Sequence, residues 1–138
     1  MLVVMEVEVV EAAVADAREN ARRAGVENVD FVAAPAEEKL PEMVREGLRP
    51  DVVVLDPPRR GCDPALIDTV SGSLAPQRVV YVSCDPATLA RDLKLFSARG
   101  YAVQRVQPVD LFPRTAHVET VALLQRETEE KGSHESCL

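Results

Sequence analysis

The chain has 138 residues, no Trp, 4% aromatic residues and a formal net charge of -7. This length suits one domain with one core. The scarcity of aromatic residues argues against binding by base stacking, and the acidic balance argues against nucleic-acid binding by this chain alone, because that affinity is largely phosphate neutralisation. The three cysteines are widely spaced and form no disulfide framework or zinc pattern, so we predict no metal site.

The opening MLVVMEVEVV lacks the basic region and the small-residue cleavage site of a signal peptide. No apolar run reaches the length that spans a membrane. We therefore expect a cytoplasmic protein with reduced cysteines and no membrane partner.

The first part of the chain predicts two strands, each followed by a helix. Short apolar segments rich in β-branched residues predict the strands, and apolar side chains at a spacing of 3.6 residues predict the first helix. Gly25 ends that helix, and Pro41 leaves the start of the second helix open. The predicted elements are strand 3–9, helix 11–24, strand 29–33 and a weaker helix 36–46.

The second part of the chain alternates in the same way. Continuous apolar runs at 51–55 and 79–83 predict strands that are buried on both faces. An Asp-Pro pair follows each run and predicts a capped helix start, at Asp63 and at Asp85. These helices extend to about residues 74 and 99. Two final strands, 101–109 and 118–125, are expected to pair antiparallel, and residues 127–138 form a polar tail that we expect to be disordered.

Strands alternating with helices predict an α/β fold with a right-handed sheet and helices on both faces, in one domain over residues 1–126. Ligand sites in such folds lie beyond the carboxyl ends of the strands. Four polar or reactive side chains fall at strand ends of this kind: Glu8, Asp56, Cys84 and Glu119.

Two of these side chains suit a cofactor site. Glu8 ends an early strand, where a carboxylate often accepts hydrogen bonds from ribose hydroxyls, although a solvated carboxylate would look the same. In the segment DPPRRG two prolines stiffen the backbone and Gly61 allows a sharp turn, so that Asp56 is held at the rim of the sheet. The alternative is an ordinary loop between a strand and a helix.

The other two suit catalysis. Cys84 precedes a helix N-terminus, whose partial positive charge favours a thiolate, but Asp85 opposes that effect. A nucleophile and an inert buried cysteine both remain open. Glu119 enters an apolar strand and can act as a base or acid, or can face water at an edge. His117 is either a second proton carrier or a hydrogen-bonded loop residue.

Taken together, four segments resemble the C-terminal catalytic domain of the RNA uracil-C5 methyltransferases, which make 5-methyluridine. They are VEVVEAAVADARENA, DVVVLDPPRRG, RVVYVSCDPATLARDL and VDLFPRTAHVETVALL. The resemblance covers about Val7 to Gln125, and it is most specific in the last two segments. It implies a Rossmann-like class I methyltransferase sheet, S-adenosylmethionine as cofactor and a uridine in ribosomal or transfer RNA as substrate.

The resemblance also implies roles for the four side chains. Cys84 adds to C6 of the uracil, and Glu119 later removes the C5 proton. Glu8 holds the ribose of the cofactor, and Asp56 lines the pocket of the cofactor and the target base.

The chain departs from the family pattern at its beginning. The first strand and the glycine-rich loop of the family domain have no counterpart, and Ala34-Pro35 stands where many members have Gly-Asp. We therefore expect a partial domain with weak cofactor binding and little activity. The strands that end at Glu8 and at Asp56 would either pair directly or leave unpaired edges, which favour a homodimer.

Three other interpretations remain. The chain could be a folded but inactive fragment that binds neither cofactor nor RNA usefully. An RNA cytosine-C5 methyltransferase would carry a further cysteine in the loop after Asp56. An amino-methyltransferase would carry an aromatic residue where Arg59 stands.

Overall fold

The computed structural model describes residues 3–111, 113–115 and 118–128. His117, Cys137 and the predicted tail beyond Thr128 lie outside the described residues. The chain forms two compact units, Met1–Arg49 and Pro50–Leu138, and each is described by itself.

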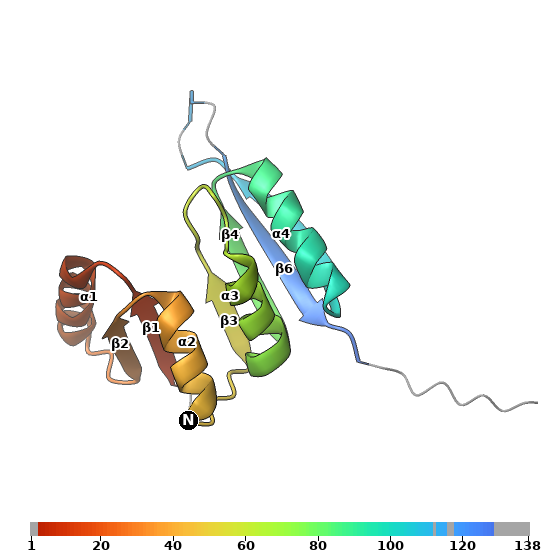
Figure 1. Ribbon diagram of the computed structural model, residues 1–138. Coiled ribbons are helices and arrows are strands. Elements are labelled where there is room, and N and C mark those ends of the chain that lie inside the picture. The colour runs from red at the N-terminus through yellow and green to blue at the C-terminus, as the bar shows by residue number, and fades with distance from the viewer. Residues whose placement is uncertain (1–2, 112, 116–117, 129–138) are drawn as a thin grey trace, which may run out of the picture. The chain divides into compact units, whose positions relative to one another are not determined.

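The first unit contains two parallel strands and two helices (Figure 1). Strand β1 (Val4–Glu8) pairs with β2 (Val29–Ala33), from Val4 opposite Val29 to Glu8 opposite Ala33. Helix α1 (Glu11–Ala24) connects the two strands. Helix α2 (Ala36–Arg45) follows β2 and contains Pro41 without ending there. The predicted positions of all four elements are confirmed to within two residues.

Helix α1 ends where the sequence predicts. Gly25 adopts a left-handed conformation with φ of 68°, and its amide bonds to the carbonyls of Ala21 and Arg22. Glycine adopts this left-handed conformation at little energetic cost because it has no Cβ. Of the large apolar side chains that the structure describes in this unit, only Val14 and Met43 are buried, so the main core lies in the second unit.

The second unit is a four-stranded mixed sheet with the order β3-β4-β6-β5. Strands β3 (Val52–Leu55) and β4 (Arg78–Ser83) are parallel, and β6 (Glu119–Arg126) lies antiparallel between β4 and β5 (Tyr101–Val109). The predicted antiparallel pairing of the last two strands is confirmed. A parallel pair needs a crossover connection, and here helix α3 (Pro64–Asp68) and the π-helix η1 (Thr69–Leu74) supply it.

Both Asp-Pro pairs begin helices, as predicted. Asp63 caps α3 (Pro64–Asp68) by accepting from the Ala65 amide, and Asp85 caps α4 (Pro86–Ala98) in the same way. The segment predicted as one helix up to about residue 74 changes type at Thr69 and continues as the π-helix η1 (Thr69–Leu74). The Ser71 hydroxyl donates to the Ile67 carbonyl at 2.6 Å, a side-chain bond of the kind that disturbs regular helical bonding.

Helices α3 and α4 lie on the same face of this sheet (Figure 1). Val79 and Tyr81 of β4 point to that face and are completely buried, as is Phe96 of α4. The Phe96 ring meets Tyr101 edge to face, with 5.9 Å between the ring centroids. The Tyr101 hydroxyl donates to the Pro76 carbonyl at 2.6 Å, so the buried polar group is satisfied.

The prediction that the continuous apolar strands are buried on both faces is wrong for β3. Val52 is 46% exposed and Val54 is 65% exposed. Burial of both faces requires a layer on each side, and the described helices of this unit cover one side. Successive side chains of a strand alternate between the faces, so every second apolar residue of β3 remains exposed.

Each of the two sheets ends in edge strands, and β1 and β3 are among them. Among the described residues β1 pairs only with β2, and β3 pairs only with β4. Within its own unit, each of these two strands therefore has one edge without a strand partner.

Candidate functional site

Three of the four predicted site residues lie at one end of the second sheet. Asp56 follows the last residue of β3, Cys84 follows the last residue of β4, and Glu119 is the first residue of β6. Because β6 runs antiparallel to β4, its start meets the carboxyl ends of the parallel strands. The chain topology thus brings together residues that are up to 63 positions apart.

The strand register places Cys84 beside Glu119. Ser83 is directly opposite Thr120 in the β4–β6 pair. Continuing that register by one residue puts Cys84 level with Glu119 on the neighbouring strand. Both side chains are partly exposed, so a substrate at this end of the sheet can reach both.

The backbone around Cys84 is held by the residues on either side of it. The buried Ser83 hydroxyl donates to the Asp85 carbonyl at 2.8 Å and accepts from the Asp85 amide at 3.1 Å. These two bonds close a tight turn with Cys84 at its centre. The thiol therefore sits on a rigid junction between strand and helix.

The amide groups at the start of α4 are engaged by Asp85. Its Oδ1 accepts from the amides of Ala87 at 2.9 Å and Thr88 at 3.0 Å. The bond from Thr88 is the main cause that lowers the pKa of Asp85 below its usual value. The carboxylate thus takes up the positive helix end beside Cys84, which strengthens the opposing effect expected from the sequence.

Asp56 begins a loop that turns sharply, as predicted. The Gly61 amide donates to the Pro58 carbonyl at 2.8 Å, and Gly61 has a φ of 80°. Asp56 itself is exposed at the rim of the sheet. Since Leu55 is opposite Tyr81, Asp56 lies level with Val82, two residues before Cys84.

Sequence reasoning missed a cluster on α4 that binds this loop. Asp92 is completely buried and accepts from the Cys62 amide at 2.8 Å. Thr88 and Arg91 donate to the carbonyls of Arg59 and Arg60. One signal was present in the sequence: the buried residues of α4 are Leu89, Asp92 and Phe96, so a carboxylate interrupts the apolar face of the helix.

Glu8, the fourth predicted residue, belongs to the first unit. It ends β1 opposite Ala33, and its Oε1 accepts from the Val10 amide at 3.0 Å. The side chain is partly exposed. A carboxylate in this setting can still accept from a ligand hydroxyl, because each of its oxygens takes more than one donor.

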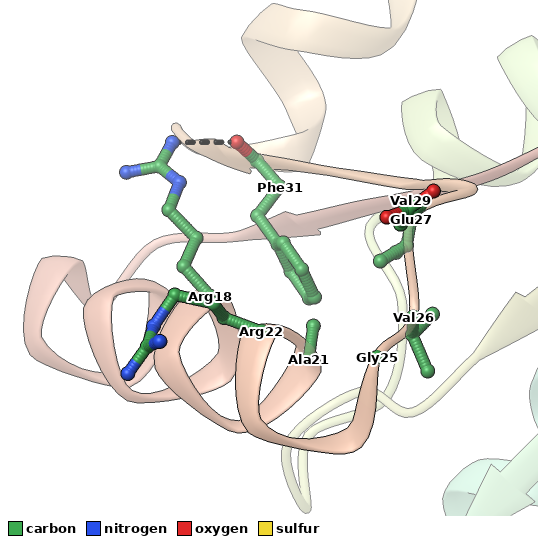
Figure 2. A pocket seen from close by; sticks show the side chains of 8 residues that line it. All are labelled: Arg18, Ala21, Arg22, Gly25, Val26, Glu27, Val29 and Phe31. Atoms are coloured by element: carbon green, nitrogen blue, oxygen red, sulfur yellow. Dashed lines mark hydrogen bonds between the residues drawn. The ribbon is translucent and has the colours of Figure 1, made fainter.

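A shallow pocket of about 280 Å³ also lies in the first unit, between the end of α1 and β2 (Figure 2). Arg18 donates to the Phe31 carbonyl at 2.7 Å at its rim, and the Phe31 ring points towards Ala21. None of the four predicted site residues lines this pocket. We therefore place the functional site at the strand ends and not in the pocket.

Within residues 3–111, 113–115 and 118–128, no group of three or more His, Cys, Asp or Glu side chains is arranged to hold a metal ion. In the same part of the chain no helix is both long and apolar enough to cross a membrane.

Comparison with known proteins identifies relatives over most of the chain. An uncharacterized RNA methyltransferase from Geobacter sulfurreducens is 56% identical over 118 residues, which are 86% of this chain and 24% of the relative. A similar protein from Clostridium acetobutylicum is 48% identical over 120 residues, which are 87% of this chain and 26% of the relative. The chain thus spans about a quarter of the length of these relatives.

Two solved structures illustrate the fold that this chain shares. NSun6 from Pyrococcus horikoshii matches with a TM-score of 0.72 at 19% identity, over 92% of this chain and 42% of that one. A SAM-dependent methyltransferase from Streptococcus mutans matches with a TM-score of 0.73 at 12% identity, over 90% of this chain and 38% of that one. These likenesses establish the class I methyltransferase fold.

The family model for the tRNA (uracil-5-)-methyltransferases matches residues 1–127. That range contains the turn at Cys84, the loop after Asp56 and the strand that begins at Glu119. The chain belongs to the tRNA (uracil-5-)-methyltransferase family.

Proposed function

We propose that the protein provides the catalytic centre for methyl transfer to C5 of a uridine in RNA, with Cys84 as nucleophile and Glu119 as base. The observation that carries this proposal is the register of β4 and β6, which puts the two residues level on neighbouring strands. Uracil C5 and C6 are adjacent carbon atoms, so a thiol that attacks one and a base that acts on the other must lie close together.

The chemistry explains why a thiol is needed. Uracil C5 is too weakly nucleophilic to take a methyl group directly. When the Cys84 thiolate forms a bond to C6, electron density moves to C5, which can then accept a methyl group. Glu119 next takes the proton from C5, the C5–C6 double bond re-forms, and the Cys84 thiolate leaves. Atoms balance, because the ring exchanges one proton for one methyl group.

S-adenosylmethionine, when bound, supplies the methyl group as an electrophile. Glu8 would hold its ribose, since a partly exposed carboxylate at the end of a parallel strand suits a pair of hydroxyl donors. In the second unit, Asp56 at the rim of the sheet would face the cofactor and the target base. The sequence contains no G-x-G segment, so we expect this chain by itself to hold the methionine end of the cofactor weakly.

The RNA partner is part of this proposal. Arg59 and Arg60 are exposed on the loop after Asp56 and can approach phosphates, but the net charge of -7 opposes tight RNA binding by this chain alone. In the longer relatives, about three quarters of the sequence lies outside the region that matches this chain. An RNA substrate and the reduced cysteines Cys62 and Cys84, which form no disulfide, favour the cytoplasm as its location.

The test is mass spectrometry after mixing the chain with RNA containing 5-fluorouridine and with S-adenosylmethionine. Fluorine at C5 cannot leave as a proton, so a working site stops as a covalent adduct. We expect the adduct to map to Cys84 and to disappear in Cys84→Ala. Cys62→Ser is the matched control, because Cys62 is 4% exposed and should keep the adduct.

With ordinary uridine RNA, Glu119→Gln should form the bond to C6 and then stop before proton removal. A folded wild-type chain that forms no adduct under saturating RNA and cofactor would contradict the proposed function for this chain.

A second candidate is a folded unit with no useful cofactor or RNA binding on its own. The unpaired edges of β1 and β3 and the absence of a G-x-G segment favour it. Titration with S-adenosylmethionine separates the two, since the second candidate predicts no saturation.

The same edges can pair two copies of the chain, because unpaired strand edges present free amide and carbonyl groups. Sedimentation over a concentration series tests this homodimer. A monomer at every concentration, with micromolar cofactor affinity, would contradict both the dimer and the expected weak binding.

A further inference from the structure

Asp92 of α4 is a buried carboxylate with no part in the proposed chemistry. It is 0% exposed. It accepts from the Tyr81 hydroxyl at 2.6 Å, the Cys62 amide at 2.8 Å and the Arg91 Nε at 3.0 Å. A carboxylate in a protein interior is costly unless donors surround it, and these three donors come from β4, from the loop after β3 and from α4 itself.

Asp92 acts with two neighbours on the same side of the helix. Residues 88, 91 and 92 are three and four positions apart, which places them on one face. The Thr88 hydroxyl donates to the Arg59 carbonyl at 3.0 Å, and Arg91 Nη2 donates to the Arg60 carbonyl at 2.8 Å. With the bond from Asp92 to the Cys62 amide, α4 binds the loop at three nearly successive backbone groups.

Gly61 lies within this set of contacts. A Cβ at position 61 would be 2.5 Å from Asp92 Oδ2 and 2.7 Å from Arg91 Nη2. Both distances are shorter than the contacts that Cβ atoms make in proteins, so the loop backbone sits directly against the two side chains. The contact is therefore specific to a residue without a Cβ.

The contacts connect the two halves of the candidate site. The loop begins at Asp56, and α4 begins two residues after Cys84. Arg59 also lies close enough to Asp85 to lower the pKa of that carboxyl, as a minor contribution beside the helix amides. The position of the loop relative to Cys84 thus depends on the hydrogen bonds between α4 and the loop.

We propose that Asp92 is a positioning residue that holds the loop Asp56–Cys62 on α4 and so sets the placement of Asp56 and Arg59 relative to the Cys84 thiol. This proposal rests on the proposed function of the same site. Tyr81 supports Asp92 from the sheet. Burial, together with the bond to Asp92, raises the pKa of Tyr81 well above its usual value, which keeps the hydroxyl protonated as a donor.

The first measurement is the rate of adduct formation with 5-fluorouridine RNA at saturating RNA, together with the RNA affinity. We expect Asp92→Ala to lower the maximal rate by about tenfold to 100-fold, as misplacement by about 1 Å can do, with the affinity unchanged. Asp92→Asn retains an oxygen for Tyr81 and Cys62 and should recover part of the rate.

Two control variants separate positioning from stability. Phe96→Leu disturbs the core one turn further along the same helix, and Asp68→Asn removes the ion pair between Asp68 and Arg99 at the other end of α4. Both should lower the melting temperature and leave the adduct rate within about twofold, because Phe96 packs against Tyr101 and Asp68 pairs with Arg99, away from the bonds that hold the loop. Equal rate losses in Phe96→Leu and Asp92→Ala at matched stability would overturn the proposal.

The second measurement needs neither RNA nor cofactor. Iodoacetamide labelling of Cys84, followed peptide by peptide, should become about threefold faster or more in Asp92→Ala, because the released loop opens the surroundings of the thiol. It should not change in Phe96→Leu. If the wild-type chain forms no adduct, the proposed function fails, and the labelling rate alone decides: an unchanged rate in Asp92→Ala overturns the positioning role.

Discussion

Replacement of Gly61 by alanine should destabilise the second unit far more than the same replacement at Gly100. Both glycines have a left-handed φ, 80° and 87°, so each variant carries the cost of placing an L-residue there, about 1–2 kcal/mol. At Gly100 a Cβ meets nothing within 4 Å, whereas at Gly61 it collides with Asp92 and Arg91. The difference between the two variants therefore isolates the collision.

The size of that difference follows from which group can move. Arg91 is 53% exposed at its side chain and can withdraw its guanidinium, but Asp92 is completely buried and held by Tyr81. The loop must retreat instead, which breaks the bond from the Cys62 amide to Asp92. Loss of one partner by a buried group costs about 1–3 kcal/mol, so Gly61→Ala should cost about 2–5 kcal/mol in total.

The assay is urea unfolding followed by tyrosine fluorescence. The chain has no Trp and two Tyr, and both Tyr81 and Tyr101 are buried in the second unit. The signal therefore reports the unit that contains Gly61. Equal losses of unfolding free energy in Gly61→Ala and Gly100→Ala would refute the close approach of the loop to Asp92.

Three further predictions concern single groups. Tyr81→Phe removes a donor from a buried carboxylate and should lower the free energy of unfolding by about 1–3 kcal/mol. Tyr101→Phe removes a bond to a neutral carbonyl and should lower it by about 0.5–1.5 kcal/mol. Urea unfolding followed by circular dichroism compares the two variants. The folded state lowers the pKa of Asp85, so its carboxylate stabilises the folded protein. This stabilisation is complete above the usual pKa of 3.8 and is lost as the pH falls through the lower pKa of the folded state. Acid titration should show that the advantage of the wild type over Asp85→Asn shrinks in that range, and a constant advantage would contradict the capping role. In the native protein, iodoacetamide should label Cys84 much faster than the buried Cys62, and in urea the two rates should converge; equal rates in the native state would show that the core around Cys62 opens.

Local structure could be predicted from the sequence because it depends on residues that are close in the chain. The helix from Glu11 to Ala24 ends at Gly25, where a left-handed residue is needed, and both bounds match the structure. The caps at Asp63 and Asp85 follow from side chains that bond amides two or three residues ahead. Such interactions do not depend on the rest of the fold.

The burial of the strand side chains and the type of the helix after Asp68 were predicted less well than the helix ends. The apolar run 51–55 gave no indication that Val52 and Val54 would be exposed, because a run of apolar residues does not reveal how many layers cover a strand. The π-helix from Thr69 to Leu74 was also missed, since it has the same apolar pattern as an α-helix over so short a length.

The candidate site depends both on the local sequence and on contacts between distant parts of the chain. The sequence by itself determined which side chains stand at strand ends, and Cys84 and Glu119 were among them. Only the tertiary structure decided that β6 lies between β4 and β5 with Ser83 opposite Thr120. It also decided that Asp92 binds the loop after Asp56 through the Cys62 amide. Pairing and burial join residues that are about 30 positions apart or more, and the free energy of such contacts depends on the whole fold and not on the neighbouring sequence.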